Sequence, residues 1–248
     1  MSSPLPPPPP IEMDNRSHKR IAALNAVFFI AEWTKYLKNS RSKKNVKNAR
    51  RKYKNKNQSK KSRDTHWYND EEVDSYFTII SRSYDNVFVL SCIFYTALRT
   101  HGISVVSRWL KRLKAYHTLM LIPVILDRHY MLVSVYLKTG RIVIYDSLKG
   151  NSIKVIGECI KSFMESSDIT LKETKWVVVN GECPVQTNDF DCGPWVCAMG
   201  LCLAKSINFW FTQGNMQDLR KDQASSIESN SLVEKAATVA TNRLRVSC

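Results

Sequence analysis

Residues 183–197 constrain this chain more than any other stretch, because they place a thiol where an apolar helical run begins. The Gly-Pro pair after Cys192 suits a tight entry and a first helical turn, and Asp191 before it is a candidate N-cap. The apolar run that follows predicts a buried helix. A thiol at the positive end of a helix dipole favours the reactive thiolate. Cys192 is therefore a candidate nucleophile, although a free cysteine here is more often a small buried hydrophobe.

Gln186 lies six residues before this thiol, on the loop that approaches the helix. Its side-chain amide and the backbone N–H of Cys192 could jointly donate hydrogen bonds to an oxyanion. Such a pair of donors is one requirement of acyl-transfer chemistry, and the other requirements must come from elsewhere in the chain.

A predicted hairpin supplies two further groups. Strands are predicted over 119–126, 130–137 and 141–145, and the turn between the last two is centred on Thr139. Antiparallel pairing brings His129 and Asp146 together at the open end of this hairpin. A cysteine peptidase needs an imidazole to move the thiol proton and a carboxylate to orient that imidazole. Taken singly, these residues would be read as a surface histidine and a turn former.

The 248 residues suffice for one core of about 150 to 200 residues with tails. The net charge of +15 is concentrated in residues 38–63, which hold thirteen Lys or Arg and no acid. We expect a flexible basic linker there, acting as a nuclear address, a phosphate-binding arm for nucleic acid or a solubilising segment. The predicted organisation is a disordered Pro-rich tail, an amphipathic helix, the linker, a catalytic domain and a C-terminal tail, over 1–17, 18–37, 38–63, 64–230 and 231–248.

The number and spacing of the cysteines indicate the cellular compartment of the protein. The seven cysteines are odd in number, and no CxxC pair or His-x3-5-His partner is present. This pattern predicts reduced thiols, an intracellular setting and no structural zinc. The sequence shows no signal peptide, and its apolar run at 26–31 is far too short to span a bilayer. We expect no metal, no organic cofactor and no membrane partner.

The remaining predicted elements complete an α+β pattern. The pattern predicts a capped helix that begins near Trp67, a buried helical segment over 87–99 and a basic amphipathic helix over 105–114. Further on, the pattern predicts helices over 153–164, 192–207 and 216–227 and a strand over 175–180.

Four spaced blocks of this sequence together resemble the ubiquitin-like-protein (SUMO/sentrin) protease family, a papain-like group that includes the adenovirus maturation protease. The blocks are Trp67-Tyr68-Asn69-Asp70, His129-Tyr130, Asp146-Ser147 and Gln186 with Asp191-Cys192-Gly193. The order His, Asp, Gln, Cys and the two spacings between its members agree with the family over roughly residues 66–227. The resemblance implies an α+β papain-like fold, with a central mixed sheet flanked by helices and the nucleophile at a helix N-terminus.

The resemblance also implies roles. Cys192 would attack the carbonyl carbon of a substrate glycine, His129 would act as general base and then acid, Asp146 would orient His129, and Gln186 would help to hold the oxyanion. An aromatic residue at the Trp67 position would cover a tunnel for a Gly-Gly terminus, and the acid at the Asp70 position would meet a basic residue of the modifier. The family usually has Trp where this chain has Tyr130, which keeps an aromatic wall and alters its shape.

Several readings stay open at this level. The leading one is a thiol peptidase or isopeptidase that cuts after Gly-Gly in a SUMO-like or other ubiquitin-like modifier. A viral or transposon-type processing protease and an acyltransferase share the fold. A protein that binds a modifier or nucleic acid without catalysis belongs to another class, and the set of Cys192, His129, Asp146 and Gln186 argues against it. The oligomeric state and the identity of the modifier are not encoded in these motifs.

Overall fold

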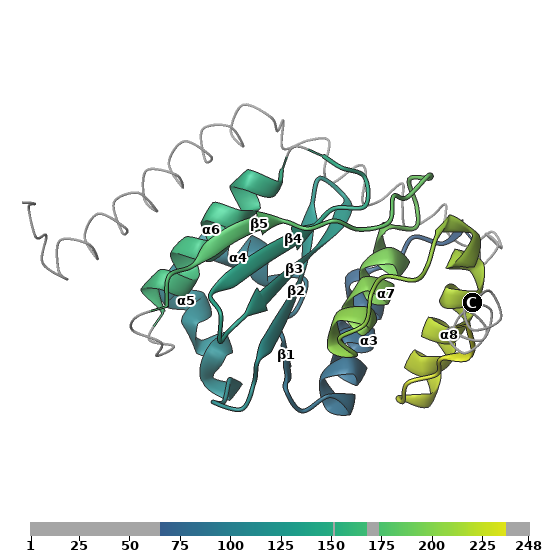
Figure 1. The fold of residues 1–248 in the computed structure, drawn as a ribbon, viewed down its shortest axis with the longest axis horizontal. Helices are drawn as coiled ribbons and strands as arrows, with labels where there is room; N and C mark the ends of the chain where they lie inside the picture. The colour runs from purple at the N-terminus through teal and green to yellow at the C-terminus, as the bar shows by residue number, and fades with distance from the viewer. Residues whose placement is uncertain (1–64, 151, 168–173, 237–248) are drawn as a thin grey trace, which may run out of the picture. The chain divides into compact units, whose positions relative to one another are not determined.

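The computed structural model describes residues 65–150, 152–167 and 174–236. Within these ranges the chain forms a five-stranded sheet with helices on both faces (Figure 1). This is the predicted α+β architecture with a central mixed sheet. The predictions that fall outside the described residues are the Pro-rich tail, the amphipathic helix, the basic linker and the last part of the C-terminal tail, at 1–17, 18–37, 38–63 and 237–248.

The sheet is mixed because its two outer pairs are parallel and its central pairs are antiparallel. Its strands, in spatial order, are β1 (Val87–Val89), β2 (Leu119–Leu126), β3 (His129–Tyr136), β4 (Arg141–Tyr145) and β5 (Val177–Asn180). The predicted hairpin is confirmed: β3 and β4 pair in antiparallel register from Tyr136 opposite Arg141 to Leu132 opposite Tyr145. Its open end therefore carries the first residue of β3 and the residue after β4.

Two local predictions were wrong in part. The segment 87–99, expected to be helical, begins as strand β1 and becomes helix α4 (Phe94–His101) only later. A short apolar run has no decisive period, and parallel pairing with β2 decides its conformation. The helix expected over 105–114 is a short α5 (Ile103–Val106) that tightens into the 3₁₀ helix η2 (Ser107–Arg112).

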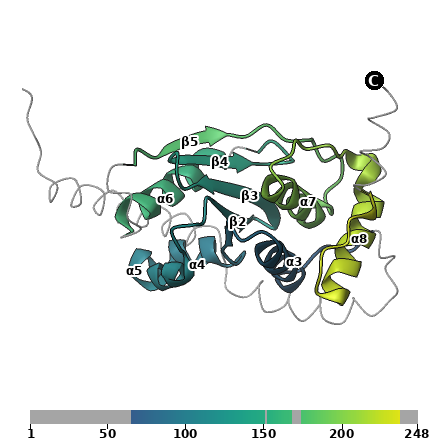
Figure 2. The ribbon, with the colours of Figure 1, turned by 60° about the horizontal axis from the view of Figure 1, so that its bottom comes forward.

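The helices divide between the two faces of the sheet (Figure 2). One face carries α4, α5 and α6 (Ile153–Ser166). The other carries α3 (Asp70–Ser83) and α7 (Cys192–Ala204), with α8 (Met216–Ser229) packed outside them after the short turn η3 (Gln213–Asn215). No helix within the described ranges is long and apolar enough to cross a membrane.

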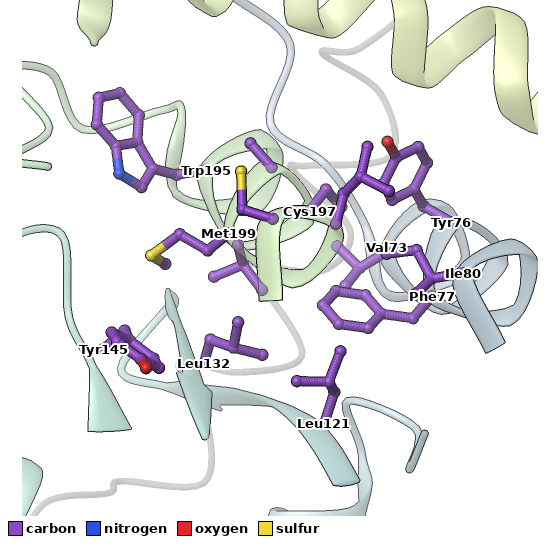
Figure 3. Packing of buried hydrophobic residues seen from close by; sticks show 14 of the residues in the cluster. Val73, Tyr76, Phe77, Ile80, Leu121, Leu132, Tyr145, Trp195, Cys197 and Met199 are labelled. Atoms are coloured by element: carbon purple, nitrogen blue, oxygen red, sulfur yellow. The ribbon is translucent and has the colours of Figure 1, made fainter. Parts of the chain in front are cut away.

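Helix α7 is apolar all round because it lies between the sheet and two other helices (Figure 3). Trp195, Cys197 and Cys202 are buried on it, in agreement with the buried helix predicted from the apolar run. The close packing has a glycine at one contact: a Cβ atom at Gly200 would lie 2.7 Å from the ring of Phe77 on α3. This dense core fixes the position of the first turn of α7, which carries Cys192.

Candidate active site

His129 and Asp146 meet at the open end of the β3–β4 hairpin. His129 is the first residue of β3, and Asp146 directly follows β4. The Nε2 atom of His129 lies 2.7 Å from Oδ1 of Asp146, which is a short, charge-assisted hydrogen bond. The two residues that the spacing predicts to be neighbours are therefore in direct contact.

The loop after β4 holds Asp146 as an ionised acceptor. Oδ1 also accepts a hydrogen bond from the backbone N–H of Leu148 at 2.9 Å, and Oδ2 accepts one from Gly150 at 2.7 Å. Burial alone would raise the pKa of Asp146, but these bonds and the bond from His129 outweigh burial and lower it below its usual value. A carboxylate held in this way keeps the facing imidazole in one orientation.

The imidazole of His129 lies between Asp146 and Cys192. Burial lowers its pKa, but the interactions with Asp146 and with the Cys192 thiol outweigh burial and raise the pKa to about 9. The second ring nitrogen, Nδ1, is buried and makes no hydrogen bond with any residue in the described part of the chain. Since Nε2 is engaged by Asp146, Nδ1 is the nitrogen left for the thiol.

Cys192 is the first residue of α7 and is almost wholly buried. The backbone carbonyl of Asp191 accepts the N–H of Trp195 at 2.8 Å, so Asp191 occupies the N-cap position as predicted. Its side chain, however, does not cap the helix. The carboxylate points to other partners, of which Arg220 is the charged one.

Gln186 is buried next to the Asp146 loop. Its backbone N–H donates to the carbonyl of Ser147 at 3.0 Å, and its side-chain Oε1 accepts a hydrogen bond from the Ser147 hydroxyl at 3.0 Å. The amide Nε2 donates to the backbone carbonyl of Asn188 at 2.6 Å and makes a longer contact of 3.3 Å with Asn188 Oδ1. Gln186, the predicted oxyanion donor, thus lies on the loop between β5 and α7 and contacts Ser147, the residue after Asp146.

Comparison with known protein families assigns the chain to one of them. The family model described as "Ulp1 protease family, C-terminal catalytic domain" matches residues 66–234, which is more than half of the chain. The chain belongs to the Ulp1 protease family. Members of this family are cysteine-type peptidases that act on ubiquitin-like proteins.

Curated relatives agree with the family assignment. A sentrin-specific protease of Caenorhabditis elegans is 26% identical over 181 residues, which cover 68% of this chain and 26% of that protein. Sentrin-specific protease 5 of Mus musculus is 32% identical over 163 residues, which cover 63% of this chain and 22% of that protein. The chain therefore spans about a quarter of the length of these relatives.

Solved structures of the Ulp1 family share the fold. A SUMO protease Ulp1 whose catalytic cysteine is oxidised to a sulfinic acid superposes with a TM-score of 0.61 at 27% identity, covering 66% of this chain and 78% of that one. A Ulp1 protease domain in complex with SMT3, the yeast ortholog of SUMO, gives a TM-score of 0.58 at 25% identity, covering 65% and 76% of the two chains.

Of the three residues predicted to bind substrate, Trp67 and Asp70 lie at the start of α3 and Tyr130 lies on β3. Tyr130 follows His129 on β3, and its hydroxyl donates to Oδ1 of Asp70 at 3.2 Å. Trp67 is half-buried and precedes the helix by three residues. The next residue, Tyr68, packs against the first turn of α7, since a Cβ at Gly193 would lie only 2.7 Å from the Cβ of Tyr68. The segment that carries Trp67 therefore lies against the turn that carries Cys192.

Some residues that hold the site were missed from the sequence. Arg220, Asn188 and Gln213 all contact the carboxylate of Asp191. The one usable signal was Arg220, a cation at helical spacing from Met216 on the buried side of α8. Within the described ranges, no cluster of three or more His, Cys, Asp or Glu side chains could hold a metal ion, and the six cysteines there are free thiols.

Proposed function

We propose that this chain is a thiol peptidase or isopeptidase that cuts after the Gly-Gly terminus of a SUMO-like or other ubiquitin-like modifier. The observation that carries the proposal is the 2.7 Å bond between His129 and Asp146, with Cys192 at a helix N-terminus beside the same imidazole. The Ulp1-family match and the likeness to a protease domain bound to SMT3 support the modifier class. The catalytic unit is proposed to span residues 64–230.

Before substrate binds, Nδ1 of His129 has taken the proton of Cys192, and Asp146 stabilises the imidazolium of the resulting ion pair. Acylation starts from this pair. The thiolate attacks the carbonyl carbon of the terminal glycine. The oxyanion accepts hydrogen bonds from the backbone N–H of Cys192 and from the Gln186 N–H that makes the longer, 3.3 Å contact with Asn188. The imidazolium gives its proton to the leaving amine as the C–N bond breaks, which leaves a thioester.

In the deacylation half-reaction, His129 is neutral again and takes a proton from water. The hydroxide adds to the thioester carbon, and the C–S bond breaks to release the modifier as a carboxylic acid, which loses its proton to the solvent. The imidazolium and thiolate that remain are the starting pair. No metal or organic cofactor takes part in either step of this scheme.

Selectivity for glycine is proposed to come from the walls near Trp67 and Tyr130. Two residues without side chains can pass through a slot that excludes all others, so sterics supply the discrimination. Asp70 is exposed at the start of α3 and is proposed to meet a basic group of the modifier. Its bond from the Tyr130 hydroxyl links this recognition group to the tunnel wall.

The test is a labelling assay. The purified chain is mixed with SUMO, ubiquitin and other ubiquitin-like modifiers that each carry a thiol-reactive group after Gly-Gly, beside a Cys192→Ala control. We expect a covalent adduct with a SUMO-type modifier that the control does not form. Hydrolysis of a fluorogenic amide of the same modifier then measures turnover.

Other outcomes would select another reading. Rapid alkylation of Cys192 by iodoacetamide without reaction with any modifier would refute the modifier specificity and favour a processing protease. Transfer of the acyl group to an added amine in preference to water would favour an acyltransferase. No alkylation and no adduct would refute the nucleophile itself.

We further propose that residues 38–63, outside the described part of the chain, bind nucleic acid through their Lys and Arg side chains and direct the protein to the nucleus of the cell. Deletion of this segment should abolish salt-sensitive binding to a DNA duplex in an electrophoretic mobility assay and leave peptidase activity intact. Loss of peptidase activity in a folded deletion variant would contradict this division of roles.

A further inference from the structure

A buried ion pair beside Cys192 takes no part in the chemistry proposed above. Arg220 on α8 donates through Nε and Nη2 to Oδ1 of Asp191, at 2.7 and 2.6 Å, and the two side chains are only 6% and 4% exposed. Desolvation of two charges offsets most of the attraction of such a pair, so burial of this kind contributes little net stability. The position of the pair, directly before the nucleophile, points to another role.

The second oxygen of Asp191 connects the nucleophile to the loop of the oxyanion donor. Oδ2 accepts hydrogen bonds from the side-chain amides of Asn188 and Gln213, each at 2.6 Å. The backbone carbonyl of Asn188 in turn accepts the Gln186 amide, and Oε1 of Gln213 accepts the backbone N–H of Thr187 at 3.0 Å. One carboxylate therefore sets the distance between Gln186 and the start of α7.

The guanidinium of Arg220 connects a third segment, residues 66–68, to the start of α7 and the loop that carries Gln186. Its Nη1 donates to the carbonyl of His66 at 2.7 Å, and its Nη2 donates to the carbonyl of Phe190 at 3.1 Å. Its carbon lies 5.2 Å from the ring centroid of Tyr68, in cation–π contact. His66 and Tyr68 flank the predicted tunnel residue Trp67.

One helix turn further along α8, Gln223 also contacts the start of α7. Its buried Nε2 donates to the backbone carbonyl of Pro194 at 2.9 Å, in the first turn of α7. Arg220 and Gln223 are three residues apart and so lie on one face of α8. That face contacts the backbone on both sides of Cys192, at Phe190 and at Pro194.

We propose that Arg220 is a positioning residue for the reaction of Cys192. Through Asp191 and the carbonyl groups that it contacts, it holds the nucleophile, the oxyanion-donor loop and the tunnel segment in one arrangement. The inference deepens the proposed function and rests on it for the roles of Gln186 and Trp67. A guanidinium presents donors in several fixed directions, and an ammonium group cannot reproduce them. Displacement of a reacting group by about 1 Å can lower the rate by about a hundredfold.

The experiment compares Arg220→Lys with Lys221→Arg, a matched exchange at the next residue, whose side chain is exposed. Three quantities are measured: the melting temperature, kcat and KM for a SUMO fluorogenic amide, and the rate of Cys192 alkylation by iodoacetamide. We expect folded Arg220→Lys to lose at least about tenfold in kcat and several-fold in alkylation rate. Lys221→Arg should stay within about twofold of the wild type in all three.

A milder variant keeps the inference open to refutation if Arg220→Lys does not fold. Gln213→Met preserves the length of a half-buried side chain and removes its bonds to Asp191 and Thr187. Arg220 and Asn188 still hold Asp191 in this variant, so the change acts mainly on the oxyanion-donor loop. We therefore expect kcat to fall about tenfold while the alkylation rate of Cys192 stays within about twofold of the wild type.

The results separate this inference from the proposed function. Alkylation needs no modifier, so slower alkylation of folded Arg220→Lys supports positioning even if the wild type cleaves no modifier. A lower melting temperature with kcat and alkylation both within twofold of the wild type would make Arg220 a purely structural residue and overturn the inference. An unchanged kcat in Gln213→Met, with Arg220→Lys unfolded, would overturn it as well.

Discussion

Replacement of Asp146 by Asn tests the charge relation on which the proposed chemistry depends. The carboxylate accepts hydrogen bonds from His129, Leu148 and Gly150. An amide of the same shape has one acceptor oxygen and one NH₂ group, so in either orientation its NH₂ faces at least one backbone N–H or the imidazole. The variant keeps the volume of the side chain and removes the negative charge.

The size of the expected effect follows from the pKa of the His129 imidazole. Asp146 and Cys192 raise the pKa of His129 to about 9, against an ordinary value of 6.5 and against the opposing effect of burial. A return to the ordinary value corresponds to about 3 kcal/mol of preference for the imidazolium. At pH 7.5 the protonated fraction would fall from about 97% to about 9%. With the orienting bond also lost, we expect kcat/KM to fall by about 10³ to 10⁴.

The assay is a titration of the His129 ring signals by NMR in the wild type, in Asp146→Asn and in a control, Asp127→Asn. Asp127 is an exposed carboxylate in the turn just before His129, so its change removes the same charge without the contact. The midpoint should move from near 9 to 6.5 or below in Asp146→Asn and stay near 9 in the control. A midpoint in Asp146→Asn that stays within half a pH unit of the wild type would refute the reasoning.

The contact between His129 and Asp146 also predicts how the stability of the protein depends on pH. Because the pKa of His129 is raised in the folded state, its contribution is complete below about pH 6.5 and is lost as the pH rises through about 9. Urea unfolding of the wild type should therefore show a decline of stability across this window, and Asp146→Asn should show a flatter profile. A decline of equal size in both proteins would contradict the assignment.

Three further substitutions test single contacts. Tyr130→Phe removes the hydroxyl that donates to Asp70 and should lower the free energy of unfolding by about 1 kcal/mol, measured by urea unfolding, with the glycine preference of the peptidase retained. Gly193→Ala places a Cβ 2.7 Å from Tyr68, so the alkylation rate of Cys192 should fall at least about tenfold; an unchanged rate would show that the first turn of α7 has room to shift. Arg128→Gly relieves a backbone φ of 68° in the two-residue β2–β3 turn and should raise the melting temperature, with a gain of about 0.5 to 1 kcal/mol; a lower melting temperature would contradict this.

The part of the site that the sequence predicts well is the part that local pairing determines. Two apolar strands on either side of a turn centred on Thr139 form one hairpin, and its register alone brings His129 and Asp146 together. The position of Cys192 at the start of a buried helix was predicted because the Asp-Cys-Gly-Pro stretch precedes an apolar run. Each of these inferences needs only neighbours along the chain or across one turn.

The parts that the sequence did not predict depend on distant partners. Strand β1 has three residues and becomes a strand because β2, some thirty residues later, offers a parallel edge. The side chain of Asp191 was expected to cap α7, but a buried guanidinium from α8 binds the carboxylate more strongly than backbone N–H groups do. Nothing in the sequence near Asp191 indicates that Arg220 lies beside it.

The order of these elements along the chain bears on biosynthesis. His129 and Asp146 can pair as soon as their hairpin has left the ribosome, whereas Cys192 receives the support of α8 only when residues up to Gln223 have been made. A nascent chain that ends before Met216 carries Cys192 without the guanidinium that binds Asp191 and the carbonyl of Phe190. If Arg220 positions Cys192 as proposed, full reactivity of the thiol requires that α8 has been translated.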